Sequence, residues 1–103
     1  MYILIKTTTD SKKIAKKLSD RILQQKLSPC IHIYSANSNY KWNNEIKRTI
    51  EYIVEIKTIN KFVNSIIEII NTLHNYDTPE IISSKINILN KNYEDWFNEN
   101  ISL

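Results

Sequence analysis

The side chains suited to metal or nucleophilic chemistry are few in this 103-residue chain, which contains one cysteine and two histidines. His74 is the best metal candidate, because neutral imidazole suits copper and zinc. The structural alternative is a loop histidine that hydrogen-bonds to the backbone and fixes the turn before Pro79. One histidine with neither a cysteine nor a second histidine beside it is not a ligand set, so we expect weak metal binding.

The cysteine, Cys30, could act as a reactive thiol if Lys57 lies beside it, since a nearby cation stabilises the thiolate. The structural alternative is a small, buried, hydrophobic side chain at the start of a strand. Lys57 also belongs with Tyr76 and Glu80 to a second candidate set. These three residues could line a cleft between subunits that takes small anions or metals, or form a hydrogen-bonded interface network.

Two aromatic residues, Tyr40 and Trp42, stand close together in a polar stretch. Large aromatic side chains commonly anchor protein interfaces. We therefore interpret Tyr40 and Trp42 as interface anchors rather than as a surface that binds a ligand. No Ser/His/Asp set and no His/carboxylate cluster has catalytic spacing. A glycine-rich phosphate loop is excluded because the chain has no glycine. We therefore expect a protein that is not an enzyme.

Composition points to a soluble protein with one domain, residues 1–103. The net charge is only +3, and the lysines at 12, 13, 16 and 17 lack interleaved aromatics, so neither nucleic acid nor membrane is an expected partner. The single cysteine fits a reducing compartment. The first apolar run ends at Lys6, and no apolar stretch reaches membrane-spanning length. We expect a cytoplasmic protein.

The stretch that must position most of these residues, 30–58, is predicted to form one long β-hairpin with a two-residue turn at Asn43-Asn44. A type I′ turn needs positive φ at both central positions, which asparagine tolerates better than other residues except glycine. Counting outward sets the register, provided that residues 35–39 contain no bulge. The predicted pairs are Trp42–Glu45, Tyr34–Ile53, Ile33–Val54, His32–Glu55, Ile31–Ile56 and Cys30–Lys57.

This hairpin is longer than the domain that carries it. Each arm of roughly 13 residues spans about 43 Å at about 3.3 Å per residue. A domain of this size has a diameter of about 34 Å. We therefore expect the tip, with Tyr40 and Trp42, to overhang the body and pack on another copy of the chain.

The remaining elements follow from apolar spacing. The pattern predicts a central strand at 2–5 and a strand from 81 that extends up to 88. It also predicts a helix over 11–26 capped by Thr9 or Asp10, and a helix from 62 to 73 capped by Asn60. A last helix is capped by Asn90 or Asn92. This is the α+β, ferredoxin-like βαββαβ order with an extra C-terminal helix. Two helices would cover one sheet face and leave the other open for self-association.

Four segments make the chain resemble the CutA divalent-ion tolerance protein family over nearly its whole length. They are Leu27-Ser28-Pro29-Cys30-Ile31-His32, the hairpin tip Tyr40-Lys41-Trp42-Asn43-Asn44-Glu45-Ile46, the strand end Glu55-Ile56-Lys57-Thr58, and the loop His74-Asn75-Tyr76-Asp77-Thr78-Pro79-Glu80-Ile81. Tyr93, Trp96 and Phe97 also match the family's terminal helix. Asn44 stands where the family usually has glycine, and Asn75 replaces its first proline.

The resemblance implies a ferredoxin-like fold, a very stable homotrimer like that of the PII signalling proteins, and a role in tolerance of copper and other divalent metals. Members credited with copper binding carry a cysteine at the end of the first strand and paired histidines before Pro-Tyr. Here those positions are Lys6 and Leu73-His74, so only His74 of that set is present.

Two other functions would each need a feature that the sequence lacks. A PII-like trimer that senses a small anionic ligand would signal through a long mobile loop, for which the Asn43-Asn44 turn is too short. An acylphosphatase-like enzyme would need an arginine-containing phosphate loop after the first strand, and Lys6-Thr7-Thr8-Thr9 contains no arginine. The leading hypothesis is a trimer that binds metal or a small ligand weakly at its subunit clefts.

Overall fold

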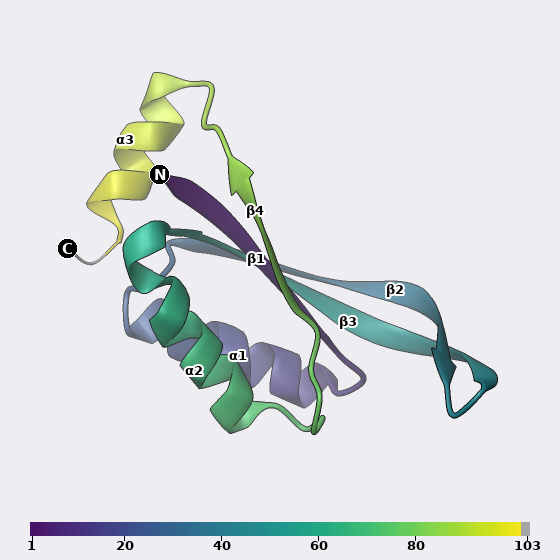
Figure 1. The fold of residues 1–103 in the computed structure, drawn as a ribbon. Helices are drawn as coiled ribbons and strands as arrows, with labels where there is room; N and C mark the ends of the chain where they lie inside the picture. The colour runs from purple at the N-terminus through teal and green to yellow at the C-terminus, as the bar shows by residue number, and fades with distance from the viewer. Residues whose placement is uncertain (102–103) are drawn as a thin grey trace.

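The computed structural model describes residues 1–101, which form an antiparallel four-stranded sheet with helices on one face and a third helix at its end (Figure 1). The strand order across the sheet is β2-β3-β1-β4. The elements are β1 (Tyr2–Thr9), α1 (Lys12–Gln24), β2 (Cys30–Trp42), β3 (Glu45–Ile59), a 3-10 turn (Asn60–Phe62), α2 (Val63–Leu73), β4 (Ile81–Ile86) and α3 (Lys91–Glu99). The predicted α+β, ferredoxin-like order is confirmed.

The core lies between the sheet and the layer that α1 and α2 form side by side (Figure 1). Alternate residues of β1 are buried on this side, as the period of two along a strand requires. Ile5, Ile56, Leu18 and Ile66 are fully buried there. Fully burying one such side chain contributes about 1.5–3 kcal/mol, so this layer supplies most of the apolar stabilisation.

The hairpin has the predicted turn and register. Asn43 and Asn44 have φ values of 52° and 64°, which are the positive values that the two central positions of a type I′ turn need. Residues of β2 and β3 pair one to one from Trp42–Glu45 down to Cys30–Lys57, so no bulge interrupts residues 35–39. All six predicted cross-strand pairs are confirmed.

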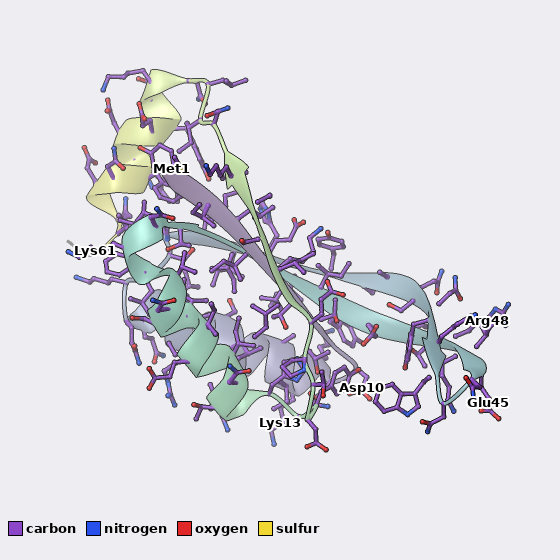
Figure 2. All side chains as sticks on the ribbon, viewed as in Figure 1. Met1, Asp10, Lys13, Glu45, Arg48 and Lys61 are labelled. Atoms are coloured by element: carbon purple, nitrogen blue, oxygen red, sulfur yellow. The ribbon has the colours of Figure 1, made fainter. Side chains whose placement is uncertain are left out.

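The tip of the hairpin overhangs the body, as its length predicted. β1 pairs with β3 only as far as Tyr52, so the part of β3 from 45 to 51 extends past β1. The described chain measures 46 × 26 × 20 Å along its principal axes. Glu45 and Arg48 mark the far end of this arm in Figure 2, well away from both helices of the layer.

Three boundary predictions were wrong. Ser11, and not Thr9 or Asp10, caps α1 by accepting the Ile14 N–H, while the Thr9 hydroxyl accepts the Ser11 N–H. Asn60 begins a 3-10 turn and makes no cap for α2. Strand β1 runs to Thr9, past the predicted end at residue 5, whereas β4 ends at Ile86, within its predicted limit of 88.

The aliphatic base of the hairpin is only partly covered. Val54 and Ile56 on β3 are fully buried, whereas Ile33 on β2 is exposed. Because β2 is the edge strand, its residues lie at the margin of the helix layer. The helices therefore cover Val54 and leave its cross-strand partner Ile33 exposed.

Helix α3 closes the end of the sheet where β1 begins. Its Phe97 is fully buried and makes an edge-to-face contact with Tyr2, at 5.2 Å between ring centroids. Asn90 precedes the helix, as one of the two predicted caps, but its side chain makes no capping hydrogen bond. Among residues 1–101, no helix is long and apolar enough to cross a membrane.

Candidate functional site

Both ring nitrogens of His74 are engaged by the backbone. Its Nε2 lies 2.8 Å from the Thr8 carbonyl oxygen, and its Nδ1 accepts the Tyr76 N–H at 3.0 Å. Because a carbonyl oxygen can only accept, Nε2 carries the hydrogen, and His74 is the neutral Nε2–H tautomer. A metal needs a free ring lone pair, which this arrangement does not leave. The geometry supports the structural interpretation of His74.

The loop after α2 is held against the end of β1 by further side-chain contacts. The Thr9 hydroxyl donates to the Asn75 side-chain oxygen at 2.6 Å, and the Asn75 amide donates to Asp10 at 2.7 Å. The His74 N–H closes the last turn of α2 on the Ile70 carbonyl. These contacts fix the position from which Tyr76 reaches the sheet.

Tyr76 contacts a buried carboxylate that sequence reasoning missed. Its hydroxyl donates to Glu51 Oε2 at 2.7 Å, and Glu51 is only 7% exposed. Burial raises the pKa of the Tyr76 phenol well above its ordinary value, and the hydrogen bond to Glu51 raises it further. No cation of residues 1–101 lies within ion-pair distance of Glu51. Glu51 is therefore a largely buried carboxylate that has one hydrogen-bond donor and no ion pair within residues 1–101.

Glu51 lay in a charged stretch of the hairpin, Glu45 to Glu55, that looks like an exposed arm in the sequence. One signal could have distinguished it. The confirmed register places Glu51 opposite Ala36, whose small side chain leaves room above the sheet. Glu51 also lies at the point where β1 ends, so the loop after α2 can cover it.

A second polar cluster lies on the sheet face that α1 and α2 leave uncovered. Glu55 receives a hydrogen bond from the Tyr34 hydroxyl at 3.0 Å and an ion pair from Lys6 Nζ at 3.3 Å. The hydrogen bond to Glu55 raises the pKa of Tyr34. Lys6 stands where the family resemblance implies a cysteine in copper-binding members, so a cation occupies that position here.

Cys30 and Lys57 face each other across β2 and β3, as predicted. Lys57 Nζ nevertheless lies 3.4 Å from the Tyr93 hydroxyl and over its ring, and Cys30 is half-buried. Lys57 is six positions along β3 from Glu51, a separation of about 20 Å. Within the described chain, Lys57 and Tyr76 therefore do not share a site, and Glu80 is exposed just before β4.

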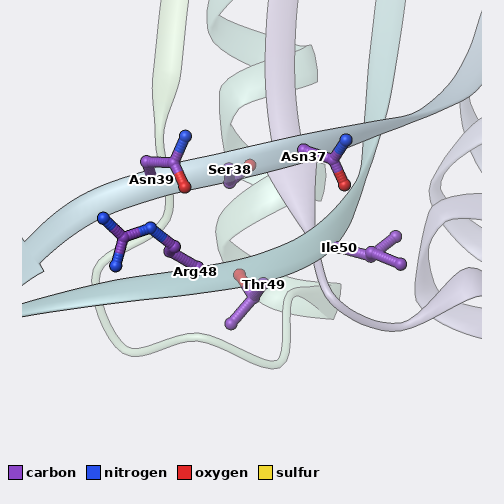
Figure 3. A pocket seen from close by; sticks show the side chains of 6 residues that line it. All are labelled: Asn37, Ser38, Asn39, Arg48, Thr49 and Ile50. Carbon is purple, nitrogen blue, oxygen red and sulfur yellow. The ribbon is translucent and has the colours of Figure 1, made fainter.

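The overhanging arm carries the other two predicted site residues in an exposed position. Trp42 is 57% exposed, and Tyr40 is also exposed. The arm also carries a small hollow of about 250 Å³. Its lining side chains, drawn in Figure 3, are Asn37, Ser38, Asn39, Arg48, Thr49 and Ile50. Tyr40, Trp42 and Arg48 are of the residue types that are enriched at protein interfaces.

No group of three or more His, Cys, Asp or Glu side chains in residues 1–101 is placed to hold a metal ion.

Comparison with known proteins decides the family. The model of the CutA1 divalent ion tolerance protein family matches residues 3–100. The chain belongs to the CutA1 family. This confirms the resemblance that the hairpin tip and the loop from His74 to Ile81 indicated.

The relatives agree in sequence and in fold. The divalent-cation tolerance protein CutA of Thermus thermophilus is 28% identical over 101 residues, which are 97% of this chain and 98% of that protein. The structure of CutA from Archaeoglobus fulgidus, described as a periplasmic divalent cation tolerance protein, superposes with a TM-score of 0.92 at 26% identity, over 99% of this chain and 100% of that one. The CutA1 structure from Ehrlichia chaffeensis gives a TM-score of 0.90 at 33% identity, over 99% and 96%.

Plant relatives are longer. The chloroplastic CutA protein of Arabidopsis thaliana is 30% identical over 95 residues, which cover 91% of this chain but 52% of that protein. The chain thus spans about half the length of this relative.

Proposed function

We propose that the chain forms a cytoplasmic homotrimer that serves in tolerance of divalent metals, without enzymatic activity, by weak binding of metal ions at clefts between its subunits. The family match and the names of the Thermus and Archaeoglobus relatives support the role in metal tolerance. The single cysteine supports a reducing compartment.

The observation that carries the proposal is the buried carboxylate of Glu51. Removing a carboxylate from water is costly unless a cation or several hydrogen bonds compensate. Within residues 1–101, Glu51 receives one hydrogen bond, from Tyr76, and no ion pair. A divalent cation would supply the missing charge, and oxygen ligands suit hard divalent ions.

The trimer is supported by the surfaces that one subunit leaves uncovered. Trp42, Ile46 and Ile50 are exposed on the arm, and Ile82 is exposed on β4. Because Ile46 pairs with Lys41 and Trp42 pairs with Glu45, Ile46 and Ile50 lie on the opposite face of the arm from Trp42, and both faces of the arm expose large apolar side chains. Packing of the arm on a neighbouring subunit would cover them and would bring a second chain close to Glu51.

Weak copper binding follows from the state of His74. To bind a metal, His74 must break its bond to Thr8 or to Tyr76. Each lost hydrogen bond costs about 0.5–1.5 kcal/mol net, which subtracts from the affinity of a site that uses this ring. The proposed cleft therefore depends on Glu51 first, and His74 contributes only at this cost.

Titration calorimetry of the metal-free protein with Cu(II), Zn(II) and a panel of nucleotides tests the proposal. We expect weak binding of a divalent metal that Glu51→Gln abolishes. Glu45→Gln is the matched control, because Glu45 is an exposed carboxylate on the same strand. Binding of a nucleotide without any metal would instead favour the PII-like sensor. Equal metal binding by the native chain and by Glu51→Gln would contradict the role of Glu51.

A further inference from the structure

A second hollow lies at the opposite end of the molecule from the hairpin tip. Its volume is about 550 Å³, within the range of small-molecule pockets, about 300–1,000 Å³. Figure 1 shows the C-terminal end of α3 and the loop after α1 on this side of the molecule. The hollow is lined by Leu23, Lys26, Ser28, Pro29, Trp96, Glu99, Asn100 and Ile101.

Large apolar side chains gather in this hollow. Trp96 is 42% exposed and Leu23 is 39% exposed, and Ile101 in the same lining is buried. Tyr93 stacks beside Trp96 at 5.5 Å between ring centroids, which leaves another part of the indole open. The hollow therefore offers an apolar floor to a ligand.

One cation and one anion line the same hollow. Lys26 and Glu99 form no ion pair with each other or with another residue of 1–101. α1 and α3 also both end here, and helix C-termini carry partial negative charge that favours an ammonium group. A ligand with an ammonium near Glu99 and a carboxylate near Lys26 would complement both.

The position of Lys26 is held by the end of α1. The Lys26 N–H bonds to the Leu23 carbonyl and the Leu27 N–H to the Ile22 carbonyl, which is the Schellman pattern. Lys26 has φ of 58°, a conformation that costs most residues about 1–2 kcal/mol and that glycine or asparagine usually adopts. A lysine here places its long cationic side chain beside the hollow at a cost to stability.

The rest of the rim is also fixed by hydrogen bonds. The Ser28 hydroxyl donates to the Cys30 carbonyl and accepts the Cys30 N–H, at 3.0 and 3.2 Å. The Asn100 amide donates to the Trp96 carbonyl at 2.8 Å. A rim that is ordered before binding loses little conformational freedom when a ligand enters.

From this combination we infer that the hollow binds a small zwitterion with an apolar side chain, of the amino-acid or dipeptide class. Its carboxylate pairs with Lys26, its ammonium pairs with Glu99, and its side chain packs on Trp96 and Leu23. The site is separate from the Glu51 cleft and does not depend on the proposed function.

Trp96 itself reports on binding. In a Trp42→Phe background, Trp96 is the one tryptophan, since the chain has two. We expect L-leucine or the dipeptide Leu-Leu to change the fluorescence emission of Trp96 in a saturable way. The ligand that binds more tightly shows whether the hollow takes an amino acid or a dipeptide. N-acetyl-leucine amide has the same side chain but no charges, and should bind at least about tenfold more weakly, since hydrogen bonds between ionised groups are about twice as strong as neutral ones.

Variants separate the two charges. Lys26→Gln should weaken binding of N-acetyl-leucine, which keeps only the carboxylate, and leave leucinamide unaffected. Glu99→Gln should do the reverse. Lys61→Gln, on an exposed lysine elsewhere, is the control and should change neither ligand.

Saturation-transfer NMR with the same ligands covers the case in which binding leaves the emission unchanged. Absence of both signals at 10 mM ligand, a concentration about tenfold above a millimolar Kd, would overturn the proposal. Equal binding of the uncharged analogue would overturn it too. Binding that occurs only after residues 102–103 are deleted would also contradict it, because the native chain would then not take the ligand.

Discussion

At the scale of single residues, His74 holds the loop after α2 to β1 through both of its ring nitrogens. Replacing it with alanine removes the bonds to Thr8 and Tyr76. We expect His74→Ala to lower the free energy of unfolding by about 1–3 kcal/mol, because polar backbone groups lose their partners. His32→Ala is the control, since His32 is exposed and should change stability little. Chemical denaturation at neutral pH measures both variants.

The His74→Ala variant also tests whether the His74 ring binds a metal ion. Because the ring is already engaged, we expect His74→Ala to leave the weak affinity for Cu(II) nearly unchanged. Sub-micromolar copper binding by the native chain, lost in His74→Ala, would show that the ring turns to bind metal and that other ligands complete the set.

The hydrogen bond from Tyr76 to Glu51 has a defined pH dependence. The pKa of Tyr76 is raised in the folded chain above its ordinary value of 10.0. The stabilisation is therefore fully present below pH 10 and is lost as the pH rises through the folded pKa. We expect Tyr76→Phe to destabilise the chain by about 1–3 kcal/mol at neutral pH, because Glu51 loses its donor.

Denaturation of both chains from pH 6 to pH 11 tests this sign. The difference between native chain and Tyr76→Phe should be constant up to pH 9 and should shrink above pH 10. The tyrosinate absorbance of the native chain and that of Tyr76→Phe should differ only after unfolding, because Tyr76 stays protonated in the folded chain over this pH range. A tyrosine that ionises near pH 10 in the folded native chain and is absent from the variant would contradict the contact.

At the scale of elements, the turn of the hairpin depends on two asparagines with positive φ. Glycine meets that requirement without steric cost, so we expect Asn44→Gly to be neutral or stabilising. Valine resists positive φ, and Asn44→Val should cost about 1–2 kcal/mol. Equal melting temperatures of the two variants would contradict the turn geometry.

The elements show what local sequence can determine. Asn43-Asn44 between two strands fixed the hairpin register, because a two-residue turn allows one pairing and the alternation agrees with it. The N-cap residue of α1 was harder to predict, because Thr9, Asp10 and Ser11 are all good capping residues. Only the path of the folded chain selects Ser11. The 3-10 turn at Asn60 likewise depends on how the end of β3 meets α2.

The candidate site was less predictable than the fold for a related reason. Tyr76 was identified from the loop, but its partner Glu51 is 25 positions away and looks like one of several charged residues on an arm. Its burial follows from where β1 stops and from the small Ala36 opposite it, which are facts of tertiary structure.

At the scale of the whole molecule, the arm and the uncovered sheet face are the surfaces on which a second chain would pack in the proposed trimer. Trp42 is exposed at the end of the arm, far from the buried core of its own subunit. Truncating a packed aromatic anchor costs about 2–4 kcal/mol per site, and a trimer contains the change three times. We expect Trp42→Ala to release monomer on dilution and to make the melting temperature depend on concentration.

The helix signal of the released monomer should be largely kept, because α1 and α2 pack on Val54 and Ile56, which lie away from the tip. Arg48→Ala, on the same arm, is a milder comparison. If Trp42→Ala leaves mass and melting unchanged and abolishes binding of a ligand, the aromatic tip is a recognition site and not an assembly anchor.

Sedimentation equilibrium of the native chain at micromolar concentration tests the central claim most directly. The overhanging arm, the exposed apolar residues and the largely buried carboxylate of Glu51 support the proposed trimer. We predict a single species of about three times the chain mass of 12.2 kDa. A species of 12.2 kDa at that concentration would contradict the trimer and, with it, the cleft between subunits in which the metal is proposed to bind.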